Sequence, residues 1–261
     1  MPSELLTERR DATLLLTISD PATRNSLSEQ VYTAGVEALG VAEADPGIRC
    51  VVLQGAGDNF CAGGDVRRLS GRVEAGDQEV QRRSIQQLHD LIDALRVFPK
   101  PVIASVEGAA AGAGFSLALA CDLIVAAEDA RFILSYGRVG LTPDGGSTWH
   151  LAQALPRQLL AQAVWLAEPL SAQQLQGYGI VNWLAGHGQA LDQALSVATR
   201  LATTAAPNAV ASAKELIRQW PPREMAEHLR AERDHFVDNL FHQNGREGLA
   251  AFLEKRKPRF T

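Results

Sequence analysis

The chain is poor in cysteine and has no long apolar run. Its 261 residues include three cysteines, Cys50, Cys61 and Cys121. They are too few and too scattered for a disulfide framework, which favours a reducing compartment. No apolar run approaches the roughly 20 residues that a membrane-spanning helix needs. The opening MPSELLTERR is charged and has no apolar signal core. These absences predict a cytoplasmic protein with no membrane partner.

A basic surplus and metal-ligand spacing are also lacking. The chain has 25 Lys and Arg against 30 Asp and Glu, a formal charge of −5. This balance argues against nucleic acid as a partner, although a local basic patch could still hold a phosphorylated ligand. No pair of Cys or His has metal-ligand spacing, so we expect no metal site. Hydrophobic and charged contents of 46% and 21% are ordinary for a soluble globular protein.

Strand and helix patterns alternate in the first part of the chain. We expect strands at 13–18, 48–55, 100–108, 121–129 and 131–135, and helices at 28–44 and 78–98. This alternation indicates an α/β fold. Later we expect a strand at 179–184 and helices at 188–204, 207–219, 223–241 and 245–256. The interpretation is an α/β core over residues 1–200 and a helical region over 201–261, with a surface loop at 73–79.

Two of the expected strands lead into glycine-bearing turns. CVVLQGAGDNFCAGGDVRRL (50–69) and PVIASVEGAAAGAGFSLALACD (101–122) leave backbone N–H groups uncovered at or near a helix start. Such donors attract negative charge. Neither turn has the spacing of a dinucleotide fingerprint or a P-loop. Ser116 lies inside an expected helix, unlike a hydrolase nucleophile. The donors could converge on one thioester oxygen, or each turn could simply permit close packing.

A third glycine turn carries an acid. GLTPDGGSTWH (140–150) surrounds Asp144 with glycines and a proline. An aspartate in such a turn either caps local N–H groups or is held there as a catalytic base.

Together these segments resemble the enoyl-CoA hydratase/isomerase (crotonase) family over essentially the whole chain. The matching segments are FCAGGD (60–65), GAAAGAGFSLALACDLIVA (108–126), RVGLTPDGGS (138–147) and FLEKRKPRF (252–260). The resemblance implies an α/β, crotonase-like spiral of β-β-α turns with a C-terminal α-helical trimerisation region. It implies a homotrimer or homohexamer that binds an acyl-CoA thioester. Coenzyme A is then part of the substrate, and no separate cofactor is expected.

The resemblance also assigns residues to the site. The oxyanion donors would be the N–H groups of Gly64 and Ala113, where Ala113 replaces the middle glycine of the family's triplet. Other substrate and coenzyme A contacts would come from Arg24, Ala62, Asp65, Val66, Arg67 and Tyr136, and from Phe252 and Lys255 of a neighbouring subunit. Asp65 would also brace the first turn. Arg68 is either a phosphate contact or a solvated surface residue.

The pattern of acids favours isomerase chemistry. The family's hydratases use two glutamates, at positions that are Ser116 and Tyr136 here. Neither residue is an ionised base near neutral pH. The family's isomerases, including those acting on ring-epoxidised phenylacetyl-CoA, place their carboxylate where this chain has Asp144. The role implied is a base that removes a proton beside the thioester and returns it two carbons along. Glu107 is a secondary candidate for this base.

Other functions remain open on the sequence. On the same scaffold these are hydratase, thioesterase, or dehalogenase with Asp144 as nucleophile; a different class is a non-catalytic acyl-CoA-binding protein. The acyl group is also open, because Phe115, Tyr136 and Trp149 fit an aromatic-tolerant pocket or the core equally well.

Overall fold

The computed structural model describes residues 2–76, 78–218, 242–244, 247–248, 251, 254, 256 and 258–261. The strands are β1 (Glu4–Arg10), β2 (Thr13–Ser19), β3 (Cys50–Gly55), β4 (Val102–Val106), β5 (Ala109–Ala111), β6 (Leu123–Ala127), β7 (Arg131–Ile133), β8 (Leu170–Ser171) and β9 (Trp183–Ala185). The α-helices are α1 (Glu29–Ala44), α2 (Val66–Ala75), α3 (Gln78–Val97), α4 (Ala113–Ala120), α5 (Ser147–Ala152), α6 (Arg157–Trp165), α7 (Ala172–Gly177), α8 (Ala190–Thr204) and α9 (Pro207–Arg218). The 3-10 helices are η1 (Pro21–Thr23) and η2 (Ser135–Val139).

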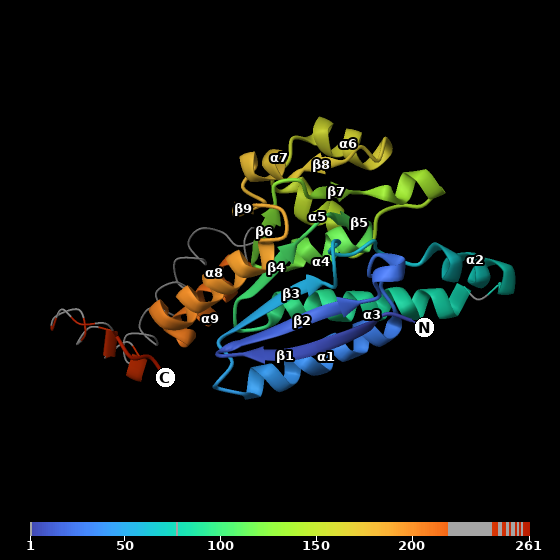
Figure 1. Ribbon diagram of the computed structural model, residues 1–261. Helices are drawn as coiled ribbons and strands as arrows, with labels where there is room; N and C mark the ends of the chain where they lie inside the picture. Colours follow the sequence, from blue (N-terminus) through green and yellow to red (C-terminus); the bar gives the residue numbers. More distant parts are fainter. Residues whose placement is uncertain are drawn as a thin grey trace.

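A six-stranded sheet forms the centre of the fold (Figure 1). Its strand order is β1-β2-β3-β4-β6-β9, and every pairing is parallel except the antiparallel β1–β2 edge. Both faces of a parallel sheet are normally covered, so its strands read as continuous apolar runs. VIASV of β4 is buried throughout, as this rule requires.

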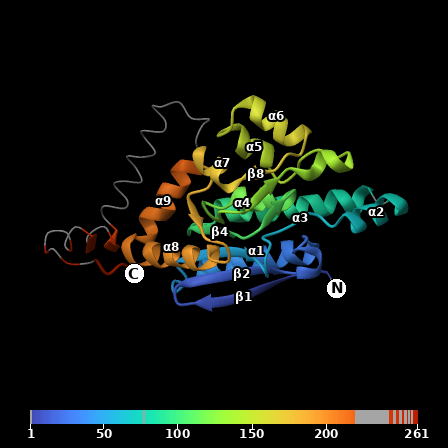
Figure 2. The same cartoon turned by 45° about the horizontal axis from the view of Figure 1, so that its top comes forward.

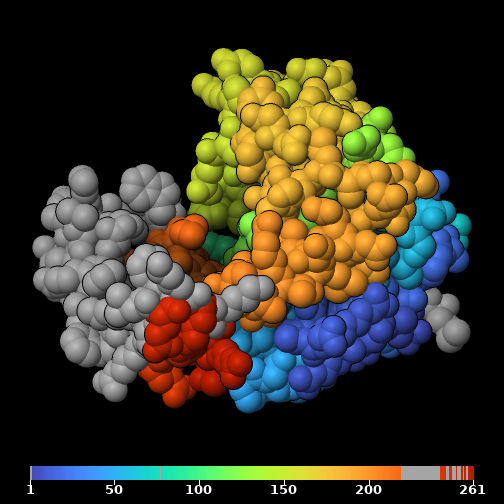
Figure 3. All heavy atoms as spheres, turned by 60° about the vertical axis from the view of Figure 1, so that its left-hand side comes forward, coloured from blue at the N-terminus to red at the C-terminus, as the bar shows by residue number. Residues whose placement is uncertain are grey.

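Helices cover both faces of this sheet. On one face Val51 and Leu53 of β3 join the larger apolar cluster with α1 and α3, while on the other Cys50 and Val52 pack with α8. Side chains alternate between faces along a strand, so one short run serves both layers. In Figure 3 the orange surface that includes α8 lies between the blue N-terminal strands and the yellow segment that holds α6. The boundary placed at residue 200 falls within α8.

A smaller sheet, with order β5-β7-β8, lies beside the main one. Each of β4 and β6 in the main sheet is followed directly by β5 or β7 in the smaller sheet, and a helical segment comes next. This is the expected β-β-α turn of a spiral, and the α/β spiral fold is therefore confirmed. Figure 2 shows α2 and the start of α3 projecting at one end of the molecule, away from the described C-terminal residues.

Several expected elements are confirmed, and the differences have physical causes. Strand β1 was missed because it is an edge strand whose residues are mostly exposed and charged. The loop expected at 73–79 is wrong, since α2 runs to Ala75 and α3 begins at Gln78. Helix α2 buries no residue, but Val66, Leu69 and Val73 recur on one helical face, so its periodicity was present in the sequence and was overlooked. The helix expected at 223–241, and most of that at 245–256, lie outside the described residues.

No helix of the described ranges is both long and apolar enough to span a bilayer.

Candidate active site

One pocket brings together the glycine turns and the acid turn. Its volume is about 750 Å³, and Gly64, Ala113, Tyr136 and Asp144 all line it. These residues come from the β3–α2 connection, the start of α4, η2 and the η2–α5 connection. The pocket is where donors for an oxyanion and a base can face one substrate.

The two donor turns interlock through their glycines. Gly63 has φ +84°, and a Cβ added there would lie 2.6 Å from the Ala111 carbonyl oxygen and 3.0 Å from the Ala113 nitrogen. A Cβ on Gly114 would lie 2.7 Å from the Cβ of Cys61. Only residues without side chains permit this approach. The close-packing role considered for these turns is therefore real, and it also places Gly64 beside the start of α4.

Both expected oxyanion donors are free within the described part of the chain. Ala113 is the first residue of α4, preceded by Gly112 at φ +53° and ψ −127°. Its N–H has no acceptor one turn earlier in the helix, as is usual at a helix start. No acceptor for the N–H of Ala113 or of Gly64 is recorded among the described residues. These two groups can therefore donate to a ligand in the pocket.

Asp144 presents its carboxylate to the pocket rather than capping its turn through neighbouring N–H groups. The Tyr136 hydroxyl donates to Asp144 Oδ1 at 2.5 Å. Burial raises the pKa of Asp144 above its ordinary value, while the hydrogen bond from Tyr136 acts in the opposite direction. Burial also raises the pKa of Tyr136, so that this hydroxyl stays protonated and remains a donor.

Ser116 of α4 holds the backbone of the turn that contains Asp144. Its hydroxyl donates to the Asp144 carbonyl oxygen at 2.8 Å. Gly145 has φ +61°, and a Cβ added there would lie 2.8 Å from Ser116 Cβ. The turn therefore packs directly on α4 at the position where the family's hydratases have a glutamate. A small hydroxyl residue suits this contact.

The expected coenzyme A contacts are split between pocket and surroundings. Ala62 and Val66 line the pocket. The Ala62 N–H donates to the Arg24 carbonyl oxygen at 2.9 Å, so Arg24 lies next to the pocket wall without lining it. Asp65 caps α2 by accepting from the Arg67 N–H at 2.9 Å, which is the bracing role expected of it. Phe252 and Lys255 lie outside the described residues.

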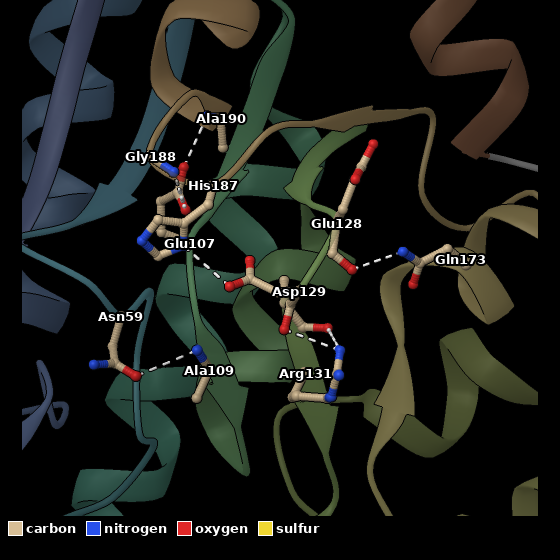
Figure 4. Close-up of polar contacts among 11 residues, drawn as sticks. Asn59, Glu107, Ala109, Glu128, Asp129, Arg131, Gln173, His187, Gly188 and Ala190 are labelled. Atoms are coloured by element: carbon tan, nitrogen blue, oxygen red, sulfur yellow. Dashed lines mark hydrogen bonds and ion pairs between the residues drawn. The ribbon is translucent and has the colours of Figure 1, made fainter.

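Glu107 is not placed as a base, which corrects its secondary candidacy. Its carboxylate accepts from the N–H groups of Gly188 and Ala190 at 3.2 and 2.8 Å, at the start of α8 (Figure 4). It does not line the active-site pocket. Glu107 lies in the β4–β5 connection, so the length of β5 separates it from Ala113. Nothing in the sequence pattern pointed to its partners at the start of α8.

Glu107 belongs to a group of three side chains that could together bind a metal ion. Potential ligand atoms of Glu107, Asp129 and His187 lie within 4.8 Å of one another. However, both Glu107 oxygens already accept backbone N–H groups, and Asp129 forms an exposed ion pair with His187 at 3.0 Å (Figure 4). Helix capping and surface pairing account for all three residues.

The aromatic lining suggested for the pocket is correct only for Tyr136. Phe115 is fully buried and packs on Phe132 with ring centroids 5.0 Å apart. Trp149 lies elsewhere, with the Arg96 guanidinium 4.7 Å from its ring centroid.

Sequence reasoning also missed Tyr32, Arg72 and Arg138, which line the pocket. Arg68 and Arg72 are four residues apart, which places them on one face of a helix, but this spacing could be used only once α2 was recognised as a helix.

Comparison with known proteins identifies the relatives of this chain. The enoyl-CoA hydratase/isomerase family model matches residues 8–261. The chain is 34% identical to the 2,3-dehydroadipyl-CoA hydratase of Escherichia coli (strain K12), covering 99% of this chain and 98% of that protein. It is 33% identical to the 1,2-epoxyphenylacetyl-CoA isomerase of the same organism, covering 98% of each chain.

The solved structures agree with this assignment. The crystal structure of an enoyl-CoA hydratase from Polaromonas sp. JS666 is 51% identical, with a TM-score of 0.96, and the match covers 99% of this chain and 100% of that one. The protein therefore belongs to the enoyl-CoA hydratase/isomerase (crotonase) family of enzymes.

Proposed function

We propose that this enzyme is an isomerase that moves a double bond of an enoyl-CoA thioester from the 3 to the 2 position. The proposal rests mainly on one observation: among the described residues that line the pocket, Asp144 is the single carboxylate. Hydration through two carboxylates needs a second acid, whereas one base suffices to carry a proton between two carbons.

The proposed reaction uses the groups already described. Asp144 takes a proton from C2, and the electron pair of that C–H bond forms an enolate whose oxygen accepts from the N–H groups of Gly64 and Ala113. The double bond moves from C3–C4 to C2–C3 as C4 takes the proton back from Asp144. Tyr136 binds Oδ1 and leaves Oδ2 to exchange the proton. Such positioned donors stabilise the charge that develops on the thioester oxygen.

Other reactions on the same scaffold must be distinguished from this isomerisation. One relative is named 1,2-epoxyphenylacetyl-CoA isomerase, and an isomerisation of that kind fits the same single-base arrangement. Other relatives are named hydratases. Hydrolysis of the thioester, or displacement of a halide by Asp144, are alternatives on the same scaffold, and binding without turnover is another.

A paired assay tests the proposal directly. Given a 3-enoyl-CoA, the enzyme should raise the absorbance of the conjugated thioester; given a 2-enoyl-CoA, it should lower that absorbance at least about 100-fold more slowly, because a second positioned acid–base group is missing. Thiol and halide release should stay at background. Hydration as fast as isomerisation would contradict the proposal, and so would thiol release without isomerisation.

The Tyr136–Asp144 hydrogen bond predicts a change in pH dependence. Asp144 acts as a base only when it is ionised, so activity falls as the pH drops through its raised pKa. In Tyr136→Phe the burial remains but the donor is lost, and the pKa of Asp144 should rise further. The acid limb of the kcat/KM profile should therefore move to higher pH. An unmoved limb would show that Tyr136 does not act on the base.

We also propose that coenzyme A is bound partly across a subunit interface in a homotrimer or homohexamer. The helical region expected from the sequence over residues 201–261, with apolar positions at Leu240, Phe241, Leu249 and Phe252, motivates this, although those four residues lie outside the described structure. Light scattering at micromolar concentration should give a trimer or hexamer. A monomer would remove the basis for the cross-subunit roles of Phe252 and Lys255.

A further inference from the structure

Two guanidinium groups of α2 form one wall of the active-site pocket. Arg68 and Arg72 are one helical turn apart, so they lie on the same face, and both line the pocket. Arg72 is neutralised: it forms an ion pair with Glu29 and donates to Gln81 Oε1 at 2.5 Å. Glu29 does not line the pocket; burial acts to raise its pKa, but hydrogen bonds from Ser84 and Arg72 lower it.

Arg68 forms no ion pair with a described residue, although its charge contributes to the lowered pKa of Glu29. Its Nη2 donates to the Leu27 carbonyl oxygen at 2.5 Å, but its Nε is buried and makes no hydrogen bond to any described residue. No carboxylate of the described chain lies within ion-pair distance of Arg68. The Nε atom is too enclosed to reach a ligand in the pocket, but Arg68 lines the pocket and no hydrogen bond to a described residue is recorded for its Nη1, so this N–H group can donate to a ligand there.

Tyr32 joins this wall to the reacting end of the pocket. Its side chain is 4% exposed, and its hydroxyl makes no recorded hydrogen bond within the described residues. Burial raises the pKa of Tyr32, the charge of Arg68 opposes that shift, and the charge of Asp144 adds to it. Tyr32 therefore lies within electrostatic range of both the base and the unpaired guanidinium.

The space near these groups is apolar. Leu69, Val73, Ile85 and Leu88 line the same pocket. An alkyl chain that starts at Asp144 therefore shares its pocket with apolar side chains, a cation and a phenol. A hydrocarbon terminus leaves Arg68 unpaired, whereas a carboxylate terminus can accept from a guanidinium N–H.

We propose that Arg68, with Tyr32, binds a carboxylate at the far end of the acyl chain, so that the natural substrate is the CoA thioester of an unsaturated dicarboxylic acid. This specificity rests on the proposed isomerase function, because it places the reacting carbons at Asp144.

The test compares two saturated thioesters of equal chain length, adipoyl-CoA and hexanoyl-CoA, by calorimetric titration. They share every coenzyme A contact and differ at the chain end alone. The wild type should bind adipoyl-CoA about tenfold more tightly, the size of one charge-assisted hydrogen bond. Arg68→Met should abolish this preference, and Arg68→Lys should keep part of it. Arg157→Met, which removes an exposed arginine on α6, should keep all of it.

Three outcomes overturn the inference. They are a wild type with no preference, an Arg68→Met variant that keeps it, and an Arg68→Met variant that weakens both thioesters equally, as a phosphate contact or a folding defect would. If Arg68→Met does not fold, the inference is still tested by the preference of the wild type for adipoyl-CoA and by the reduced preference expected of Arg68→Lys.

Because the saturated thioesters do not react, this binding preference is independent of catalysis. A preference without isomerisation of 3-hexenoyl-CoA or of its ω-carboxylate analogue contradicts the proposed function alone. Isomerisation without a preference contradicts the chain-end site alone.

Discussion

Asp144→Asn should lower isomerisation of a 3-enoyl-CoA at least about 100-fold, the usual contribution of a positioned general base. The amide keeps the size of the side chain and still accepts from Tyr136 through its carbonyl oxygen. It cannot take a proton from C2. Affinity for the CoA ester should remain within a few-fold, because the proposed binding contacts lie on Gly64, Ala113 and the coenzyme A residues. Steady-state kinetics and titration with a saturated acyl-CoA measure the two effects separately.

Isotope exchange gives this prediction a second readout. In heavy water the wild type should incorporate deuterium beside the thioester, and Asp144→Asn should not. Glu107→Gln is the matched control, because it makes the same carboxylate-to-amide change on an acid that caps α8 outside the pocket. It should exchange at the wild-type rate, even if its stability falls. Exchange by Asp144→Asn at the wild-type rate would make Asp144 a turn residue only.

The parts of this site that were predictable from the sequence are those fixed by backbone geometry. Gly63 and Gly112 have positive φ, and Gly63 and Gly114 lie at close approaches between chain segments. Such demands leave glycines in the sequence, and the glycines located both donor turns. The parallel sheet was equally visible, because burial on two faces requires continuous apolar runs such as VIASV.

The remaining features depend on contacts between segments that the sequence pattern does not relate. The role of Glu107 is set by Gly188 and Ala190, far along the chain. The apolar residues of α2 recur at helical spacing, but the helix buries no residue, so the sequence alone did not show that Arg68 and Arg72 form a pocket wall. Charged side chains on an exposed helix look like solvated surface until the partner elements are placed.

Ala113→Pro should lower isomerisation about 100- to 1000-fold, the usual effect of removing one oxyanion donor. Ala113 is the first residue of α4, where proline is tolerated because its φ suits a helix start and no intrahelical hydrogen bond is lost. The substitution therefore removes the proposed N–H donor while α4 can still form. Ala113→Gly is the matched control: it restores the family's triple glycine, keeps the donor and should retain activity within a few-fold. Circular dichroism and thermal unfolding should show folded protein for both variants. If folded Ala113→Pro isomerises like the wild type, then the thioester oxygen does not bind at the start of α4, and the enolate must be stabilised by other groups of the pocket.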